Sequence, residues 1–321
     1  MADAPPIEVR GLVKRYGEIL AVDDVDLTIN PGDVFGYLGP NGAGKTTSLR
    51  MMLGLIRPTS GSVRLFGRDP QISVGALEGV AGFVEAPTFY PYLSGRANLE
   101  LYAALDGDDA TPRIDEVLET VDLQDRAKDK VKGYSHGMRQ RLGIASALLR
   151  SPRLLLLDEP ATGLDPAGMR DMRELIRALG ERGITVLLSS HLMPEVEELC
   201  NRVAIIRSGR VAYEGFLDEL RARAGVSYRL RTTDDELARR ICEGQAGVDD
   251  VVDSKPAGLL FKAQDESAVA ALSLALAESG APVLELTPRQ ATLEEVFFQL
   301  TEGASTDGAG APSLGEIEAV A

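Results

Sequence analysis

A phosphate-binding loop constrains the fold of this chain more than any other feature. Residues 39–46 read Gly-Pro-Asn-Gly-Ala-Gly-Lys-Thr, a complete match to the pattern G-x-x-x-x-G-K-[ST]. The pattern requires a strand before it and a helix after it. Residues 33–38 are typical of a buried strand, and residues 46–54 of a helix that ends at a glycine. In such a turn, backbone N–H groups converge on an anion at the positive end of the helix. We therefore expect a nucleoside triphosphate to bind here together with Mg²⁺.

The residues of this loop have separate predicted tasks. Gly39, Gly42 and Gly44 permit positive φ angles and a close approach of the backbone to phosphate. Lys45 can reach the β- and γ-phosphates, and the Thr46 hydroxyl can ligate Mg²⁺. The predicted nucleotide-binding residues of this segment are Gly39, Pro40, Asn41, Gly42, Ala43, Gly44, Lys45, Thr46 and Thr47.

Composition narrows the class of protein. The chain has 321 residues, of which 44% are hydrophobic and 26% charged, as is usual for a globular protein of about two domains. The net charge of −15 argues against general nucleic-acid binding, which needs a basic face. Cys200 and Cys242 have no metal-ligand spacing and suggest no disulfide framework, so a reducing cytosol is the default.

The sequence predicts no membrane insertion. Residues 1–6 are acidic and contain proline, so we expect no signal peptide. No stretch approaches the ~18–20 apolar residues of a transmembrane helix. A role at a membrane would therefore require a partner chain.

Residues 7–215 predict one α/β domain. Short β-rich segments precede a mostly helical segment at 96–149, and strands then alternate with helices as far as residue 206. The run 154–157 is all leucine, without the polar alternation of a half-exposed strand, and this is typical of a strand buried on both faces. Alternating strands and helices predict a parallel sheet with right-handed crossovers.

The pattern changes at Gly225. Residues 226–287 predict the order β-α-β-β-α-β, which is that of a small α+β ferredoxin-like domain. A last helix is predicted at 292–300, and the following residues are rich in Gly, Ala and Ser and predicted to be disordered. The predicted divisions are 1–224, 225–301 and 302–321.

Two further segments carry polar groups at the ends of predicted elements. Asp158 and Glu159 follow the strand 154–157, at the edge where open α/β sheets bind ligands. The aspartate can hold Mg²⁺ and the glutamate can deprotonate an attacking water; the alternative is a solvated acidic turn. Residues 134–141 begin a helix at a serine, which predicts a second anion site or, taken alone, an ordinary N-cap.

The order of these motifs resembles the ATP-binding cassette, the nucleotide-binding subunit of ABC transporters, over residues 7–215. Residues 82–85 occupy the place of the family's glutamine loop, and residues 134–138 occupy that of its signature Leu-Ser-Gly-Gly-Gln. Residues 163–165 resemble the loop that crosses the dimer interface. The resemblance implies a P-loop NTPase fold with a RecA-like parallel core, an antiparallel β subdomain and a helical subdomain at about 87–150.

The resemblance also implies a mechanism with ATP, Mg²⁺ and a head-to-tail homodimer. ATP on one subunit would be covered by Ser135 and Gly137 of the other, with Asp165 at the interface. Tyr16 would stack on adenine, and His191 would sense the γ-phosphate. The implied catalytic residues are Lys45, Glu159 and His191, and the implied metal ligands are Thr46, Asp158 and Glu85.

Two positions depart from the family pattern. Glu85 stands where the family usually has glutamine, and it brings negative charge to a site that already holds two carboxylates. Two roles therefore stay open for Glu85: it is either a metal ligand or a residue that acts mainly in coupling. The signature has His136 and Met138 in place of Gly and Gln. We interpret His136 as a variant position with no catalytic task.

An aromatic cluster follows Glu85. Phe89, Tyr90 and Tyr92 lie in a proline-flanked loop, at the place where the family receives a short helix of its membrane subunit. Exposed aromatic side chains are common interface anchors. The alternative is that these rings fold back into the helical subdomain.

Residues 85–87, the added C-terminal domain and the ending 291–300 resemble the ATPase subunits of bacterial bacitracin- and daunorubicin-resistance exporters, whose permease is a separate chain. The resemblance implies a peripheral ATPase at the cytoplasmic face of the bacterial plasma membrane that powers export of a drug, antibiotic or lipid-like substrate. The alternative is a non-transport cassette protein that acts on ribosomes or nucleic acid, but such proteins usually carry two cassettes or basic segments. An isolated P-loop kinase or GTPase would need neither the signature segment nor residues 163–165.

Overall fold

The structure is a computed structural model that describes residues 4–105, 110–223, 226–254, 257–290, 292–293 and 296–297. Most of the predicted last helix (292–300) and all of the predicted tail (302–321) lie outside the described residues. The chain divides into two compact units, Met1–Gly215 and Phe216–Ala321. The sequence placed this boundary after residue 224, whereas the contacts divide the chain at the end of the last strand of the first unit.

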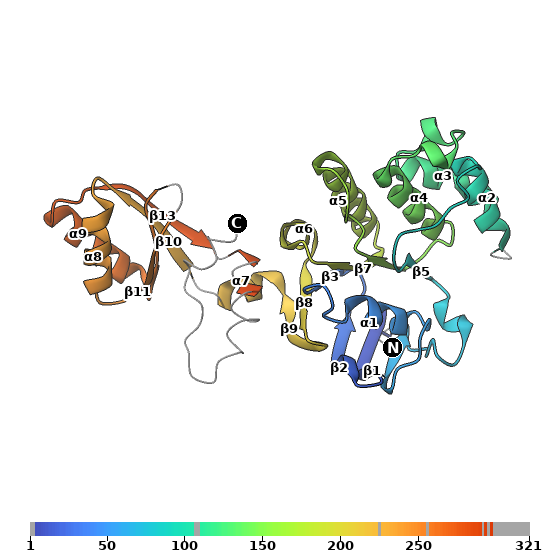
Figure 1. Cartoon of the computed structure of the whole chain (residues 1–321), viewed down its shortest axis with the longest axis horizontal. Helices are drawn as coiled ribbons and strands as arrows, with labels where there is room; N and C mark the ends of the chain where they lie inside the picture. The colour runs from blue at the N-terminus through green and yellow to red at the C-terminus, as the bar shows by residue number, and fades with distance from the viewer. Residues whose placement is uncertain are drawn as a thin grey trace. The chain divides into compact units, whose positions relative to one another are not determined.

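A six-stranded sheet is the centre of the first unit, and its order is β5-β6-β7-β3-β8-β9 (Figure 1). The strands from β5 to β8 are parallel, as the alternation of strands and helices predicted. The turn Ser208–Gly209 joins β8 to β9, which closes this edge as a hairpin. The bounds are β3 (Val34–Leu38), β5 (Val80–Phe83), β6 (Leu154–Asp158), β7 (Thr185–Ser190), β8 (Arg202–Arg207) and β9 (Arg210–Phe216).

The register of three neighbouring strands positions the functional site. Leu38 at the end of β3 pairs with Ser190 at the end of β7, and Ser189 pairs with Asp158 at the end of β6. The phosphate-binding loop, the acidic pair and His191 therefore leave the sheet at the same carboxyl edge, as expected for a ligand site of an open α/β sheet.

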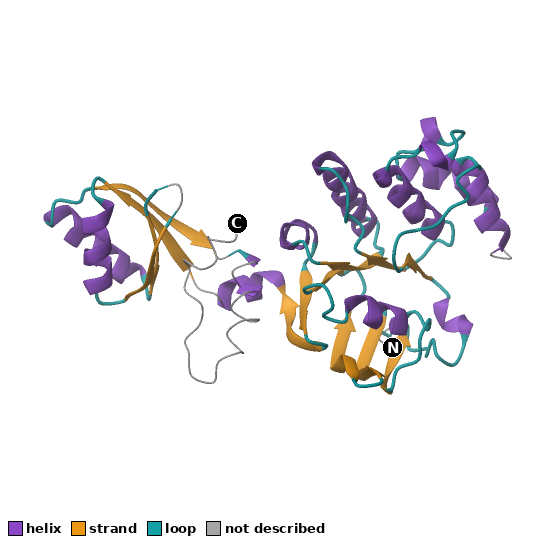
Figure 2. Ribbon diagram, viewed as in Figure 1, coloured by secondary structure: helices purple, strands orange, loops and turns teal. Residues whose placement is uncertain are grey.

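A second, antiparallel sheet has the order β2-β1-β4. Helix α1 (Lys45–Met52) lies between this sheet and the parallel strands, whereas α5 (Pro166–Glu181) and α6 (Met193–Leu199) cover the other face (Figures 1 and 2). One core of buried aliphatic and aromatic side chains joins both sheets across α1. The strand bounds are β1 (Ile7–Tyr16), β2 (Ile19–Ile29) and β4 (Ser60–Leu65).

The predicted helical segment forms a separate group in the first unit. It contains α2 (Gly95–Leu105), α3 (Ile114–Thr120) and α4 (His136–Leu148), and α4 packs against β5. Among the described residues, short 3-10 helices lie at Thr111–Arg113, Gln124–Arg126 and Val131–Gly133 in this group, and at Val74–Leu77 before it. The α/β class with a parallel sheet, an antiparallel β subdomain and a helical group is confirmed.

The second unit begins with α7 (Leu217–Arg223) and has its own core. Its four-stranded sheet has the order β11-β12-β10-β13, and neighbouring strands are antiparallel. Two helices pack against this sheet, and the element order is the predicted β-α-β-β-α-β. The bounds are β10 (Val226–Thr232), α8 (Asp235–Gly244), β11 (Val248–Asp253), β12 (Leu259–Ala263), α9 (Glu266–Glu278) and β13 (Val283–Gln290).

Candidate active site

Two glycines allow the phosphate-binding loop to lie close to its neighbours. Gly44 precedes α1 with a φ of 104°, and a Cβ there would lie 2.4 Å from the carbonyl oxygen of Ala21. A Cβ on Gly39 would lie 2.4 Å from the carbonyl oxygen of Ile206. Any other residue would collide with backbone at both positions. No side chain caps α1 and no acidic residue stands in its first turn, so its N-terminal N–H groups are available to an anion.

Lys45 is buried at the start of α1, with 5% of its surface exposed. Its Nζ donates to the Gly39 carbonyl oxygen at 2.6 Å and lies 3.2 Å from Oε1 of Glu159. A buried ammonium group is costly without such partners. Because the carboxylate and the carbonyl can both be exchanged for phosphate oxygens, the amine is poised to bind a triphosphate at the end of α1.

Oxygen ligands suitable for Mg²⁺ meet beside this lysine. The Thr46 hydroxyl donates to Oδ2 of Asp158 at 2.9 Å, and the Ser189 hydroxyl donates to Oδ1 of the same carboxylate at 2.5 Å. Mg²⁺ prefers oxygen ligands and usually takes few from protein, with the rest from phosphate and water. Within the described residues, no group of three or more His, Cys, Asp or Glu side chains could form a metal site. The Thr46–Asp158 pair therefore fits a metal that nucleotide brings with it.

Glu159 stands at the centre of a hydrogen-bonded network. Its Oε2 accepts from the Thr162 hydroxyl at 3.0 Å and lies 2.7 Å from Nδ1 of His191. Its backbone has a φ of 51°, and its N–H donates to the Ser189 carbonyl oxygen at 3.2 Å. This left-handed conformation is rare for residues other than glycine, so the fold holds the carboxylate at this position against a local cost.

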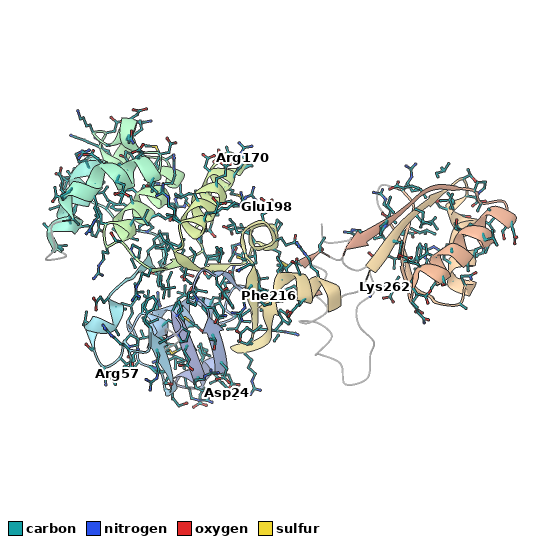
Figure 3. All side chains as sticks on the ribbon, turned by 180° about the vertical axis from the view of Figure 1, so that it is seen from behind. Asp24, Arg57, Arg170, Glu198, Phe216 and Lys262 are labelled. Atoms are coloured by element: carbon teal, nitrogen blue, oxygen red, sulfur yellow. The ribbon has the colours of Figure 1, made fainter. Side chains whose placement is uncertain are left out.

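His191 follows β7 and leads into α6, and α6 is held against α5. Arg173 of α5 lies 3.1 Å from Oε2 of Glu198 on α6, and Arg177 donates to the Glu198 carbonyl oxygen at 3.1 Å. Figure 3 shows Arg170 and Glu198 on these two neighbouring helices. These contacts hold α6, which begins two residues after His191, against α5.

A pocket of about 320 Å³ opens between these groups. Most predicted residues of the loop line it, and so do Glu159 and His191, the other two residues predicted to be catalytic. Residues that line it are Ala21, Pro40, Asn41, Gly42, Gly44, Lys45, Thr46, Thr47, Glu159, Thr162 and His191.

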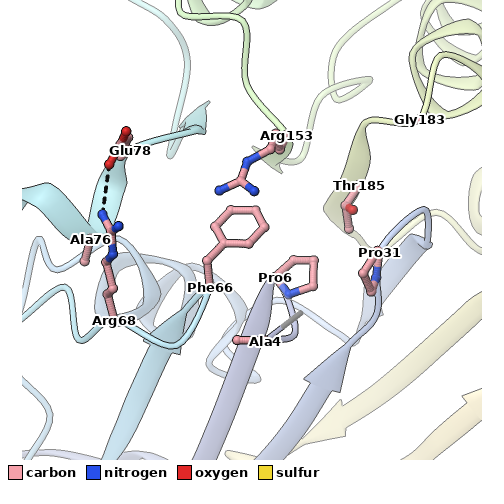
Figure 4. A pocket seen from close by; sticks show the side chains of 10 residues that line it. All are labelled: Ala4, Pro6, Pro31, Phe66, Arg68, Ala76, Glu78, Arg153, Gly183 and Thr185. Carbon is pink, nitrogen blue, oxygen red and sulfur yellow. Dashed lines mark hydrogen bonds and ion pairs between the residues drawn. The ribbon is translucent and has the colours of Figure 1, made fainter. Parts of the chain in front are cut away.

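A larger cavity of about 440 Å³ lies elsewhere in the same unit (Figure 4). The Arg153 guanidinium stands over the Phe66 ring at 4.1 Å, and Arg68 pairs with Glu78. Arg153 directly precedes β6, and Thr185, which also lines the cavity, begins β7. The cavity therefore borders the amino edge of the parallel strands, opposite the edge that carries the phosphate-binding loop.

Comparisons with known proteins agree with this geometry. The family model described as ABC transporter matches residues 22–162. The chain is 39% identical over 301 residues to the bacitracin transport ATP-binding protein BcrA of Bacillus licheniformis, covering 93% of this chain and 98% of that protein. The chain belongs to the ABC transporter family. It is an ATP-binding ATPase subunit of that family, as the sequence predicted.

Two further likenesses cover different lengths of the chain. The daunorubicin/doxorubicin resistance ATP-binding protein DrrA of Streptomyces peucetius is 36% identical over 325 residues, covering 98% of each chain. A solved dimeric ATP-binding cassette in a post-hydrolysis state with ADP and phosphate has a TM-score of 0.59 and 26% identity, covering 66% of this chain and 98% of its own. None of the helices within the described residues is long and apolar enough to cross a membrane.

Several predicted ABC residues lie outside the pocket. Ser135 caps α4 by accepting from the Met138 N–H at 3.2 Å, and Asp165 caps α5 by accepting from the Gly168 N–H at 3.1 Å. Tyr16 ends β1 with 47% of its surface exposed. Predicted nucleotide contacts that do not line the pocket of this chain are Tyr16, Gly39, Ala43, Ser135, Gly137 and Asp165.

Glu85, at the position of the family's glutamine, also lies outside the pocket. Its backbone has a φ of 72°, its side chain is 67% exposed, and it forms an ion pair with Arg50 of α1. Its carboxylate charge is therefore balanced by a residue of the helix that begins at the phosphate-binding loop.

The aromatic cluster divides between the two predicted alternatives. Phe89 packs edge-on against Tyr102 of α2, with ring centroids 6.0 Å apart. Tyr90 and Tyr92 lie 5.8 Å from each other and are 54% and 62% exposed. One ring thus folds back onto the helical group, and two remain at the surface.

Sequence reasoning missed three residues of the site. Thr162 donates to Glu159, and Ser189 donates to Asp158. Glu195 is buried in the first turn of α6, and its Oε2 accepts from the Ser190 hydroxyl at 2.7 Å. The signal for Ser189 was present, because it ends the strand beside the acidic pair and parallel strands share their carboxyl edge. Nothing in the spacing alone indicated that Glu195 would be buried.

Proposed function

We propose that this chain is the ATP-hydrolysing subunit of a bacterial exporter that moves an antibiotic, drug or lipid-like substrate through a separate membrane permease. The observation that carries this proposal is the near full-length similarity to bacitracin and daunorubicin resistance proteins, which extends beyond the cassette through the second unit. The exposed pair Tyr90 and Tyr92 is the surface proposed to receive the permease. The proposed location is the cytoplasmic face of the plasma membrane.

Lys45 and Glu159 are proposed to exchange partners when ATP binds. Lys45 now neutralises Oε1 of Glu159, and the triphosphate would draw the ammonium group to its own oxygens. Oε1 is then free to accept the proton of an attacking water, while His191 and Thr162 hold Oε2. This exchange ties the basicity of the carboxylate to the presence of nucleotide.

Thr46 and Asp158 are the residues proposed to hold Mg²⁺. When bound, the ion would neutralise charge that develops on the phosphate oxygens. Ser189 orients the aspartate, and Lys45 and the first turn of α1 supply fixed positive charge at the same phosphates. Glu85 is proposed as a coupling residue in an ion pair with Arg50, although the sequence also allowed it as a metal ligand.

The proposed assembly is a head-to-tail homodimer with ATP between the subunits. Ser135, Gly137 and Asp165 lie outside the pocket of their own chain, which supports a role at the nucleotide of a partner. The likeness to a dimeric cassette gives independent support.

The second unit is proposed to be a ferredoxin-like domain. Its strand order is β13-β10-β12-β11, which is 4-1-3-2 when the four strands are numbered along the chain, and its strand pairs are antiparallel.

Capture of the partner tests the transport proposal. Tagged Glu159→Gln protein is incubated with native membranes and ATP, and the proteins that bind are identified. A Lys45→Ala/Glu159→Gln double variant is the matched control, because it lacks the phosphate-binding amine. ATP-dependent recovery of a polytopic membrane protein would support the exporter. Recovery of ribosomes or nucleic acid with no membrane protein would replace it with a non-transport cassette protein.

A further inference from the structure

His136 makes a hydrogen bond that a glycine at the same position cannot make. Its Nε2 lies 3.0 Å from the Thr162 carbonyl oxygen, and because a carbonyl only accepts, Nε2 carries the hydrogen. The family pattern has Gly at this place in the signature, so this contact is a property of the present chain. Gly163 has a φ of 77°, and a Cβ there would stand 3.4 Å from the same nitrogen. The imidazole therefore lies directly against the turn that follows Glu159.

Thr162 connects this hydrogen bond to the carboxylate of Glu159, the proposed general base. Thr162 accepts from His136 with its carbonyl oxygen and donates to Oε2 of Glu159 with its hydroxyl at 3.0 Å. The same Oε2 lies 2.7 Å from His191. One short turn thus connects the signature segment (residues 134–138) with the general base of the same chain.

The same two segments also approach each other beside this hydrogen bond. A Cβ added to Gly137 would lie 3.5 Å from the Leu164 side chain, so little space separates the signature segment from residues 162–165. His136 is the first residue of α4, and Ser135 caps that helix. The start of α4 thus carries both the capping serine and the imidazole that contacts the Thr162 carbonyl oxygen.

We propose that His136 is a positioning residue that links the signature segment to Glu159 through Thr162. This inference rests on the proposed head-to-tail dimer, in which Ser135 contacts the nucleotide of the partner. Closure on the partner's ATP would then set the position of Glu159 beside the chain's own ATP. Because coupling between sites is reciprocal for binding, each nucleotide would favour the catalytic arrangement at the other site.

Two substitutions of His136 separate this role from a purely structural one. His136→Ala removes the donor, whereas His136→Gln keeps an amide donor near the position of Nε2. Loss of one hydrogen bond predicts a fall in kcat of about three- to tenfold. We also expect the Hill coefficient for ATP to fall toward about one. KM should stay within about twofold, because His136 does not line the pocket. His136→Gln should restore most of kcat and cooperativity.

Thr162→Ala supplies the second arm of a double-variant cycle, since it removes the hydroxyl but keeps the carbonyl. If both residues act through Glu159, the His136→Ala/Thr162→Ala protein should be no less active than the less active of the two single variants. Unchanged kcat and Hill coefficient in His136→Ala, failure of His136→Gln to restore them, or losses that multiply in the double variant would overturn the inference. The ATP-dependent dimer is measured separately, by light scattering of Glu159→Gln. If Glu159→Gln stays monomeric with ATP, the proposed dimer and the coupling between sites are refuted. The kcat values of the double-variant cycle still test whether His136 acts on Glu159 of the same chain.

Discussion

Glu195, four residues after His191 in the chain, provides the most direct test of the electrostatics at the start of α6. Its side chain lies in the first turn of α6 with 2% of its surface exposed. Oε2 accepts from the Ser190 hydroxyl at 2.7 Å, but Oε1 has no hydrogen-bond partner among the described residues. Burial raises the pKa of this carboxyl, and the Ser190 hydrogen bond opposes the shift. The nearby Glu159 raises the same pKa further.

The direction in which stability changes with pH follows from the number of protons that the folded and unfolded states bind. With a pKa raised in the folded protein, native Glu195 retains a proton that the unfolded chain has released, so stability falls as pH rises above about 4.3, the ordinary glutamate value. Glu195→Gln is a model of the protonated acid. A buried charged oxygen without a partner costs about 1–3 kcal/mol, so the variant should be more stable by about 1 kcal/mol at pH 8. For a unit of this size that corresponds to a rise in Tm of about 2–4 °C.

Calorimetry of the full chain at pH 5 and pH 8 measures this difference. The transition that ATP raises belongs to the cassette unit, because ligand binding stabilises only the fold that binds it. Glu100→Gln on the exposed face of α2 is the control for the same chemical change without burial. The gain in Tm should be larger at pH 8 than at pH 5. A Glu195→Gln protein that is less stable than wild type at pH 8 would show that the ionised carboxylate is favourable there, and would refute the reasoning.

Three further substitutions test the assigned roles. Lys45→Ala should reduce kcat at least about a hundredfold and weaken ATP binding about tenfold, because it removes the buried positive charge from the proposed phosphate site. Phosphate release measures the first effect and fluorescent-nucleotide titration the second. Glu159→Gln should reduce kcat by a factor of about 10²–10³ while ATP binding is retained, and turnover equal to wild type would exclude it as the base. Glu85→Gln should leave kcat within about threefold and the Mg²⁺ dependence unchanged, because its partner is Arg50 in an exposed pair. A large shift in the Mg²⁺ concentration for half-maximal rate would instead identify Glu85 as a ligand.

In the six-stranded sheet, the sequence predicted inner strands better than edge strands. The predicted strands 33–38 and 154–157 lie within one residue of the ends of β3 and β6. No strand was predicted at β5 or β9, the two edges of the six-stranded sheet. β5 has four residues and includes Gly82, and β9 is mostly half-exposed or exposed. An edge strand is held by backbone pairing on one side only, so its side chains show little of the hydrophobic pattern that identifies a buried strand.

The same distinction explains which parts of the site could be predicted. Lys45, Asp158 and Glu159 belong to local motifs whose predicted chemistry follows from residue type and spacing, and parallel register brings these motifs to one edge of the sheet. His136 was interpreted from sequence as a variant position of the signature segment with no catalytic task. Its contact with Thr162 depends on how α4 approaches the turn after β6, which is a matter of packing between subdomains. Hydrophobic periodicity in a single sequence does not predict how two subdomains pack against each other. Residues that connect motifs are therefore harder to predict than the motifs themselves.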